Sequence, residues 1–138
     1  METYLDQGRG SCFLSRPDLA RLVEDAVCFF HGQRYDLRAW VVMPNRVHAV
    51  FKVDSTPMSE IVGGWKNYTA NEANKVLGFR GAFWEADYWD TYMRSTAHEL
   101  QTIRYTENNP SKAGFVLDPK KWSWSSARFR DEYGRLCL

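Results

Sequence analysis

The residues with the clearest chemical potential begin in an alternating segment, residues 46–53. Arg46 and His48 are two positions apart, and residues at that spacing in a β-strand point to the same face. Side chains placed in this way can converge on one small ligand, such as a metal ion or a phosphate. The commoner role of a single strand histidine is structural, with its ring held by hydrogen bonds. The strand alone leaves both interpretations open.

Tyr105 and Asn109 form a second pair, four residues apart in a segment that predicts a helix, so they share a helix face. A phenol, with an ordinary pKa near ~10, is a weak nucleophile, but it can attack phosphorus when a nearby cation stabilises its oxyanion. An asparagine carbonyl oxygen can bind a hard metal ion. The alternative is that Tyr105 packs against the core and Asn109 ends the helix before Pro110. Spacing excludes neither interpretation.

The surrounding segments predict the elements that must position these side chains. Apolar residues recur at helical spacing in three segments, and they alternate in two segments that a Pro44-Asn45 turn joins. The order helix–strand–strand–helix–strand–helix predicts an α+β domain with helices packed on one face of an antiparallel sheet. Residues 1–14 contain no convincing strand. The predicted helices are 16–31, 56–78 and 96–109, the predicted hairpin strands are 35–42 and 46–53, and a short strand is expected within 83–93.

Length and composition limit the classes of protein that this chain can belong to. With 138 residues and 44% hydrophobic residues, residues 1–138 are expected to form one domain rather than a disordered chain. No apolar run approaches the length of a membrane span, and the N-terminus lacks the features of a secretory signal. The absence of Cys-x-x-Cys argues against a zinc site or a disulfide framework, so we expect buried thiols and a cytoplasmic location. The cysteines are Cys12, Cys28 and Cys137.

Several longer motifs together resemble one family. The segment Trp40-Val41-Val42-Met43-Pro44-Asn45-Arg46-Val47-His48 is similar to the segment that carries the His-hydrophobic-His pair of HUH-type tyrosine transposases, and it resembles the REP-associated branch most. The resemblance covers residues 35 to 126 in the right order. It continues through Lys66-x-x-Thr69-Ala70, Gly81-x-Phe83-Trp84, Asp87-Tyr88-x-Asp90, Arg94, Tyr105-x-x-x-Asn109-Pro110-x-Lys112-Ala113-Gly114 and Trp122-x-Trp124-Ser125-Ser126.

The resemblance implies a ferredoxin-like fold and a transposase that nicks and rejoins single-stranded DNA at hairpins. In this family a helix-borne tyrosine attacks the DNA backbone, which forms a 5′-phosphotyrosine and frees a 3′-hydroxyl. Residue by residue, Tyr105 matches the nucleophile, His48 the second histidine of the pair, and Asn109 the third metal ligand. The metal implied is Mg²⁺ or Mn²⁺.

The chain departs from the family in two places. Arg46 stands where the family has the first metal-binding histidine, and a guanidinium has no lone pair to offer a metal. Metal binding should therefore be weakened or lost, and Arg46 could instead clamp a phosphate. The first strand of the sheet is missing or atypical, so the N-terminal arm supplies a poor substitute, a partner chain completes a homodimer, or the chain is a shortened form.

These features leave three functions open: a tyrosine transposase, a catalytically degenerate protein that binds structured DNA, and an interaction module without a nucleic-acid partner. The net charge of +1 does not decide among them. Any DNA contact is expected on the second predicted helix and the C-terminal region, where a solvated charged face is the alternative. The candidate DNA-binding residues are Lys66, Arg80, Lys112, Lys120 and Lys121.

Overall fold

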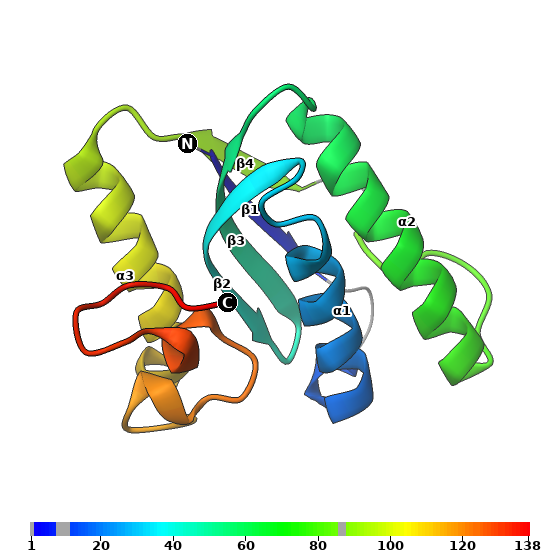
Figure 1. The fold of residues 1–138 in the computed structure, drawn as a ribbon. Coiled ribbons are helices and arrows are strands. Elements are labelled where there is room, and N and C mark those ends of the chain that lie inside the picture. Colours follow the sequence, from blue (N-terminus) through cyan, green and yellow to red (C-terminus); the bar gives the residue numbers. More distant parts are fainter. Residues whose placement is uncertain (1, 8–11, 86–87) are drawn as a thin grey trace.

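Four strands and three helices follow one another along the part of the chain that the computed structural model describes, residues 2–7, 12–85 and 88–138 (Figure 1). Short 3₁₀ turns lie at Phe13–Ser15, Pro119–Lys121 and Ser126–Phe129. The strands and helices are β1 (Glu2–Gln7), α1 (Pro17–Phe29), β2 (Tyr35–Met43), β3 (Arg46–Val53), α2 (Met58–Leu77), β4 (Trp89–Tyr92) and α3 (Thr96–Lys112).

The strands form one antiparallel sheet in the order β2-β3-β1-β4. The elements β1-α1-β2 and β3-α2-β4 are thus two interleaved units, and this is the topology of a ferredoxin-like fold. The predicted α+β class and antiparallel sheet are confirmed. The helix α3 follows as an addition to the two units.

The first strand, which was expected to be missing or atypical, is present. Residues Glu2–Gln7 form β1, which pairs with β3 on one side and with β4 on the other. This strand is short and contains Glu2 and Asp6, which are disfavoured in strands, so its signal in the sequence is weak. Pairing on both sides satisfies its backbone. The position from which a homodimer was inferred is therefore filled by the chain itself.

The two faces of the sheet carry different helices. Helices α1 and α2 pack together on one face, but α3 lies on the opposite face, so the prediction that the helices share one face is wrong for α3 (Figure 1). Alternation along β3 sends Val47, Ala49 and Phe51 to the α1–α2 face. That face holds the main apolar cluster, which includes Leu19, Val23, Val27, Tyr35, Leu37, Trp40, Val47, Ala49, Phe51, Ile61, Val62 and Trp65.

The helix α3 begins where the sequence predicts, since the Ser95 hydroxyl accepts a hydrogen bond from the His98 backbone N–H at 3.1 Å. It does not end at Asn109, as predicted. The helix continues through Pro110 to Lys112, because the Ala113 N–H bonds to the Asn109 carbonyl at 3.0 Å and closes a further turn beyond the proline. Asn109 therefore lies inside the helix.

The segment that follows α3 runs along the outer edge of β2. The Val42 N–H donates to the Trp124 carbonyl at 2.8 Å, and the Trp122 indole N–H donates to the Val42 carbonyl at 3.0 Å. The Trp40 N–H donates to the Ser126 hydroxyl at 3.0 Å. These contacts cover an otherwise open strand edge. They give the Trp-x-Trp-Ser-Ser motif a structural role.

Two expectations about composition can be compared with the structure. None of the helices described is both long and apolar enough to cross a bilayer. The three thiols were expected to be buried, but Cys12 and Cys137 are exposed and Cys28 is half-buried. Burial raises the pKa of the Cys28 thiol to about 12, with the neighbouring Glu24 and Asp25 acting in the same direction.

Candidate nucleic-acid site

A hydrogen bond between Arg46 and Asn109 links the start of β3 to the last turns of α3. The Arg46 Nη2 donates to the Asn109 Oδ1 at 2.9 Å, and the Arg46 Nη1 donates to the Asn45 Oδ1 at 3.3 Å. Only 9% of Asn109 is exposed. The two residues that the sequence singled out on separate elements thus meet. The amide oxygen expected to bind a metal accepts a charge-assisted hydrogen bond instead.

His48 lies beneath this pair, on the same face of β3, and is buried. Burial, with the positive charge of Arg46 as a second cause, lowers the pKa of His48 to about 4. The ring is therefore neutral near pH 7. The Thr106 hydroxyl donates to the Thr102 carbonyl at 2.8 Å, so its oxygen can accept a hydrogen bond from His48 Nδ1, which lies 3.3 Å away. That contact favours the tautomer with its proton on Nδ1.

Tyr105 is the solvent-facing member of the group. It is 55% exposed, and its ring meets the His48 ring edge-on, with centroids 6.1 Å apart. The Lys112 ammonium lies 5.7 Å from the centroid of the Tyr105 ring. The structure therefore brings Tyr105, His48, Asn109 and Arg46 together at one place on the α3 face, with a cation from the last turn of α3 beside the phenol.

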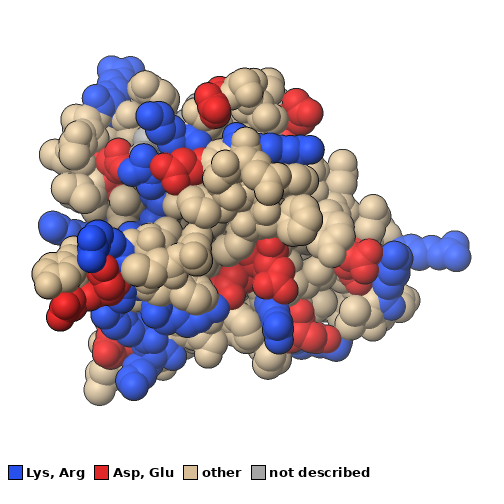
Figure 2. Space-filling model, viewed as in Figure 1, with Lys and Arg blue, Asp and Glu red and all other residues tan. Residues whose placement is uncertain are grey.

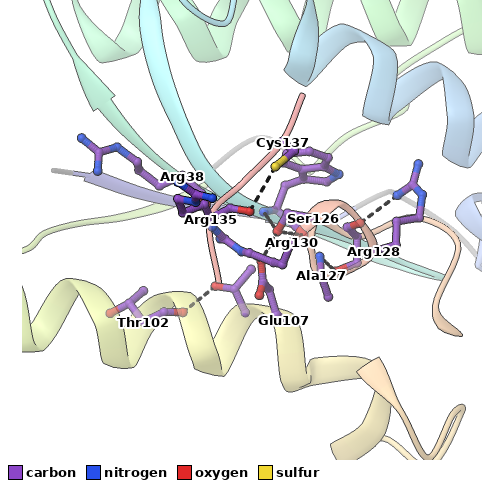
Figure 3. A network of polar contacts seen from close by, with 12 residues as sticks. Arg38, Thr102, Glu107, Ser126, Ala127, Arg128, Arg130, Arg135 and Cys137 are labelled. Carbon is purple, nitrogen blue, oxygen red and sulfur yellow. Dashed lines mark hydrogen bonds and ion pairs between the residues drawn. The ribbon is translucent and has the colours of Figure 1, made fainter. Parts of the chain in front are cut away.

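A polar network fixes α3 against the sheet, and its central residue, Glu107, was not predicted from the sequence. Glu107 Oε2 accepts from the Ser126 hydroxyl at 2.5 Å and from Arg130 Nε at 3.0 Å (Figure 3). The same Arg130 guanidinium donates to the Arg38 carbonyl at 2.5 Å. Because Glu107 lies between Tyr105 and Asn109 in the helix, this anchor sets the rotation of α3 about its axis.

A second ion pair ties the C-terminal segment to α1. The Arg128 guanidinium donates to the two carboxylate oxygens of Glu24 at 2.8 and 2.6 Å, and the Trp40 indole donates to the same carboxylate at 2.9 Å. Such bidentate pairing gives specificity of geometry as well as energy. Glu24, like Glu107, carries no local signal in the sequence, because each partner is far away along the chain.

The five candidate DNA-binding residues do not lie on one surface. Lys112, Lys120 and Lys121 lie at the end of α3 and in the turn that follows it. Lys66 lies in α2, where it donates to the Glu85 carbonyl at 3.0 Å, and Arg80 follows the end of that helix. Figure 2 shows Lys and Arg side chains gathered, with some acidic ones among them, at the lower left, over the end of α3 and the segment after it.

The residues present do not fit the metal centre that the family resemblance implies. Arg46 has no lone pair for a metal, and its guanidinium already binds the Asn109 amide oxygen. His48 is neutral and chemically suited to a metal, but of the other two ligand positions one is replaced by Arg46 and the other, Asn109, has its amide oxygen bound to that arginine. Across residues 2–7, 12–85 and 88–138, no group of three His, Cys, Asp or Glu side chains could hold a metal ion.

Comparison with solved structures agrees with the fold described above. The chain is similar to a REP-associated tyrosine transposase solved with a bound REP hairpin, with a TM-score of 0.72 and 21% identity over 91% of this chain and 74% of that one. This chain has the fold of that transposase. A candidate transposase from Deinococcus radiodurans R1 matches 78% of this chain and 89% of its own length, with a TM-score of 0.52 and 19% identity. No protein-family model and no curated protein matches the sequence.

Proposed function

We propose that this protein binds hairpin DNA through the α3 face, and that Arg46 supplies the positive charge that a metal ion would otherwise bring to a DNA phosphate. The observation that carries the proposal is the hydrogen bond from Arg46 to Asn109, which places a permanent cation among the residues matching a transposase active site. The solved transposase with this fold is described as bound to a REP hairpin.

Guanidinium and phosphate are well matched for this task. Arg46 uses one Nη atom on Asn109 and the other on Asn45, so its position is fixed before DNA arrives. A guanidinium has five N–H donors in a rigid fork. It can therefore donate to phosphate oxygens while it keeps one of its hydrogen bonds to Asn109 or Asn45. Neutral His48 adds no charge of its own to the site. Lys112, beside Tyr105, adds a second cation for the DNA backbone.

A second candidate function is metal-free cleavage by Tyr105. The exposure of Tyr105 beside Lys112 favours it, because an attacking phenol oxygen must reach the phosphorus and be stabilised as an anion. In that reaction the tyrosine oxygen forms a bond to the phosphorus, the phenol loses its proton to solvent, and the bond to the 3′-oxygen breaks. That oxygen leaves with a proton as a 3′-hydroxyl, and the 5′-phosphotyrosine remains.

One set of assays on a hairpin with a single-stranded flank distinguishes the two. We expect the wild-type protein to bind this DNA without cutting it, in Mn²⁺ or in EDTA. Arg46→His removes the guanidinium from Asn109 and restores two imidazoles and an amide, so it should cut in Mn²⁺ only. Cleavage by the wild type in EDTA supports the second function, whereas wild-type cleavage that requires Mn²⁺ contradicts our assignment of Arg46.

The salt dependence of binding locates the surface. Replacing Lys112, Lys120 and Lys121 together with alanine should reduce the log–log salt slope by about 2, at about 0.7 for each single-strand phosphate contact. The matched change is alanine at Lys66 and Arg80, which lie with α2, and this change should leave the slope nearly unaltered. A reduced slope for the Lys66 and Arg80 variant, with no change for the three-lysine variant, would instead place the bound DNA on the α1–α2 side of the sheet.

A further inference from the structure

Two aromatic rings form a stacked pair beside the end of α3. The rings of Phe115 and Trp122 have centroids 5.4 Å apart and planes only 19° from parallel. Phe115 lies just beyond the end of α3, and Trp122 just beyond the turn Pro119–Lys121. Phe115 is 52% exposed. One face of the phenyl ring is therefore covered by the indole while much of the residue reaches solvent.

Hydrogen bonds hold both residues in place. The Trp122 indole N–H donates to the carbonyl of Val42 in β2 at 3.0 Å. The Phe115 backbone N–H donates to the carbonyl of Pro110 in α3 at 2.9 Å. The pair therefore rests on the sheet and on the helix that carries Tyr105. A ring that is already ordered loses little conformational entropy when a ligand stacks on it.

Exposed lysines lie close to both rings in the sequence. Lys112 lies three residues before Phe115, and Lys120 and Lys121 come directly before Trp122; all three are exposed. Asp118 is the acidic residue within this stretch, and its carboxylate accepts the Lys120 backbone N–H at 3.0 Å. An exposed aromatic face with lysines around it suits a single-stranded nucleic acid, whose bases stack and whose phosphates pair with cations.

We propose that Phe115, supported by Trp122, is a stacking platform for one unpaired nucleobase of the single-stranded DNA next to the hairpin. The inference rests on the proposed function and deepens it, because it assigns the single-stranded flank to a defined part of the surface. Lys112 connects the two regions, since it lies beside Tyr105 and precedes Phe115 by one helical turn. The flank thus runs from the Arg46–Tyr105 group toward the end of α3.

The test compares a blunt hairpin with hairpins that carry a 5′ or a 3′ single-stranded flank. In each flank, 2-aminopurine replaces one base at a time, and its fluorescence falls when the base stacks. Phe115→Leu keeps an apolar side chain of similar size but removes the aromatic face. Leu117→Ala is the matched control, because Leu117 lies in the same loop, is fully exposed and has no ring.

We expect fluorescence to fall at one flank position with the wild type. Phe115→Leu should abolish this change and weaken flanked-hairpin binding about 5- to 100-fold, the range that one lost base stack gives. Phe115→Trp should restore both. Blunt-hairpin binding by Phe115→Leu, and flanked-hairpin binding by Leu117→Ala, should stay within about twofold of the wild type, and thermal unfolding should show that each variant is folded.

The outcomes separate the two proposals. If the wild type binds hairpins but Phe115→Leu binds the flanked form equally well, the platform is wrong and the proposed function stands. If Leu117→Ala weakens binding as much as Phe115→Leu, the loop contributes apolar contact rather than stacking, which also overturns the platform. If the wild type binds neither hairpin nor single-stranded DNA, both proposals fail, and the exposed pair belongs to a protein contact.

Discussion

The two faces of the sheet differ in what holds them together. On the α1–α2 face, apolar side chains from both helices and from the sheet form one large buried cluster. On the α3 face the apolar cluster is small, with Ala39, Val50 and Met93 buried and Ile103 packed against them. There, polar contacts of Glu107, Arg130 and Asn109 hold the helix.

The difference indicates that the two faces of the sheet have different roles. Apolar packing tolerates small shifts of a helix, whereas hydrogen bonds from Glu107 and Asn109 fix both its position and its rotation. The α3 face buries fewer apolar side chains, and its buried polar residues, His48 and Asn109, lie next to solvent-facing Tyr105. Stability should therefore depend mainly on one face, and the proposed DNA binding on the other.

The largest expected effect is a loss of stability on the α1–α2 face. Phe51 is fully buried and packs against Tyr35 and Trp65, with ring centroids 5.8 and 5.2 Å away. Phe51→Ala should lower the free energy of unfolding by about 3–5 kcal/mol. Ile103→Ala, the counterpart on the half-buried α3 side, should lower it by only about 1 kcal/mol. Equal losses in urea denaturation would contradict the division between the faces.

The second prediction concerns how the stability of the fold depends on pH. A histidine in the unfolded chain has a pKa near 6.5. Burial lowers the pKa of His48 in the folded protein to about 4. Between these values the unfolded state binds more protons, so stability should fall as pH falls from 6.5 to 4, by up to about 3 kcal/mol. His48→Gln should remove this part of the pH profile. The control is His98→Gln, which alters an exposed histidine and should leave the pH profile of stability unchanged. An identical profile for both variants would contradict the assignment of this pH dependence to His48.

The third prediction weakens the polar anchor. Glu107→Gln takes the carboxylate from Arg130, whose side chain is only 15% exposed, and should cost about 2 kcal/mol because the buried cation loses its partner. Hairpin affinity should fall as well, since α3 loses its anchor. The control is Glu72→Gln, which breaks the exposed ion pair with Lys75 and should change stability by less than about 0.5 kcal/mol. If the two variants behave alike in denaturation, Glu107 does not hold α3.

The smallest effect on stability is expected at Tyr105. Because its side chain is exposed, Tyr105→Phe should change the free energy of unfolding by less than about 0.5 kcal/mol and hairpin affinity by less than about threefold. Combined with Arg46→His, it should abolish the covalent protein–DNA adduct that Arg46→His alone forms in Mn²⁺. An adduct that survives in the double variant would assign the nucleophile to another tyrosine, with Tyr92 the first to examine.

The fold was predictable wherever periodicity is strong. Helical spacing and the Pro44-Asn45 turn place α1, α2 and the β2–β3 hairpin within a few residues of their observed bounds. The central strand β1 was not predictable, because a six-residue strand with two acidic residues has little signal of its own. Its partners are distant in sequence, so tertiary pairing overrides local propensity there.

The candidate site was predictable in part for the same reason. Strand and helix spacing put Arg46 with His48 and Tyr105 with Asn109, and the structure brings the two pairs together. That the Arg46 guanidinium binds Asn109 could not be derived, because nothing in the sequence shows how α3 is rotated against the sheet. Glu107 was missed because its anchors, Ser126 and Arg130, come from a later segment.

The position of β1 has a consequence for how the protein is synthesised. β1 is translated before both strands that flank it, β3 and β4. The nascent β1 therefore stays unpaired until β3 has emerged, and it gains its second partner only with β4; long-range pairing of this kind slows folding. A truncation that removes residues 1–7 would leave the β2–β3 hairpin without a neighbour and β4 without any strand to pair with. β1 is thus the strand that joins β4 to the rest of the sheet.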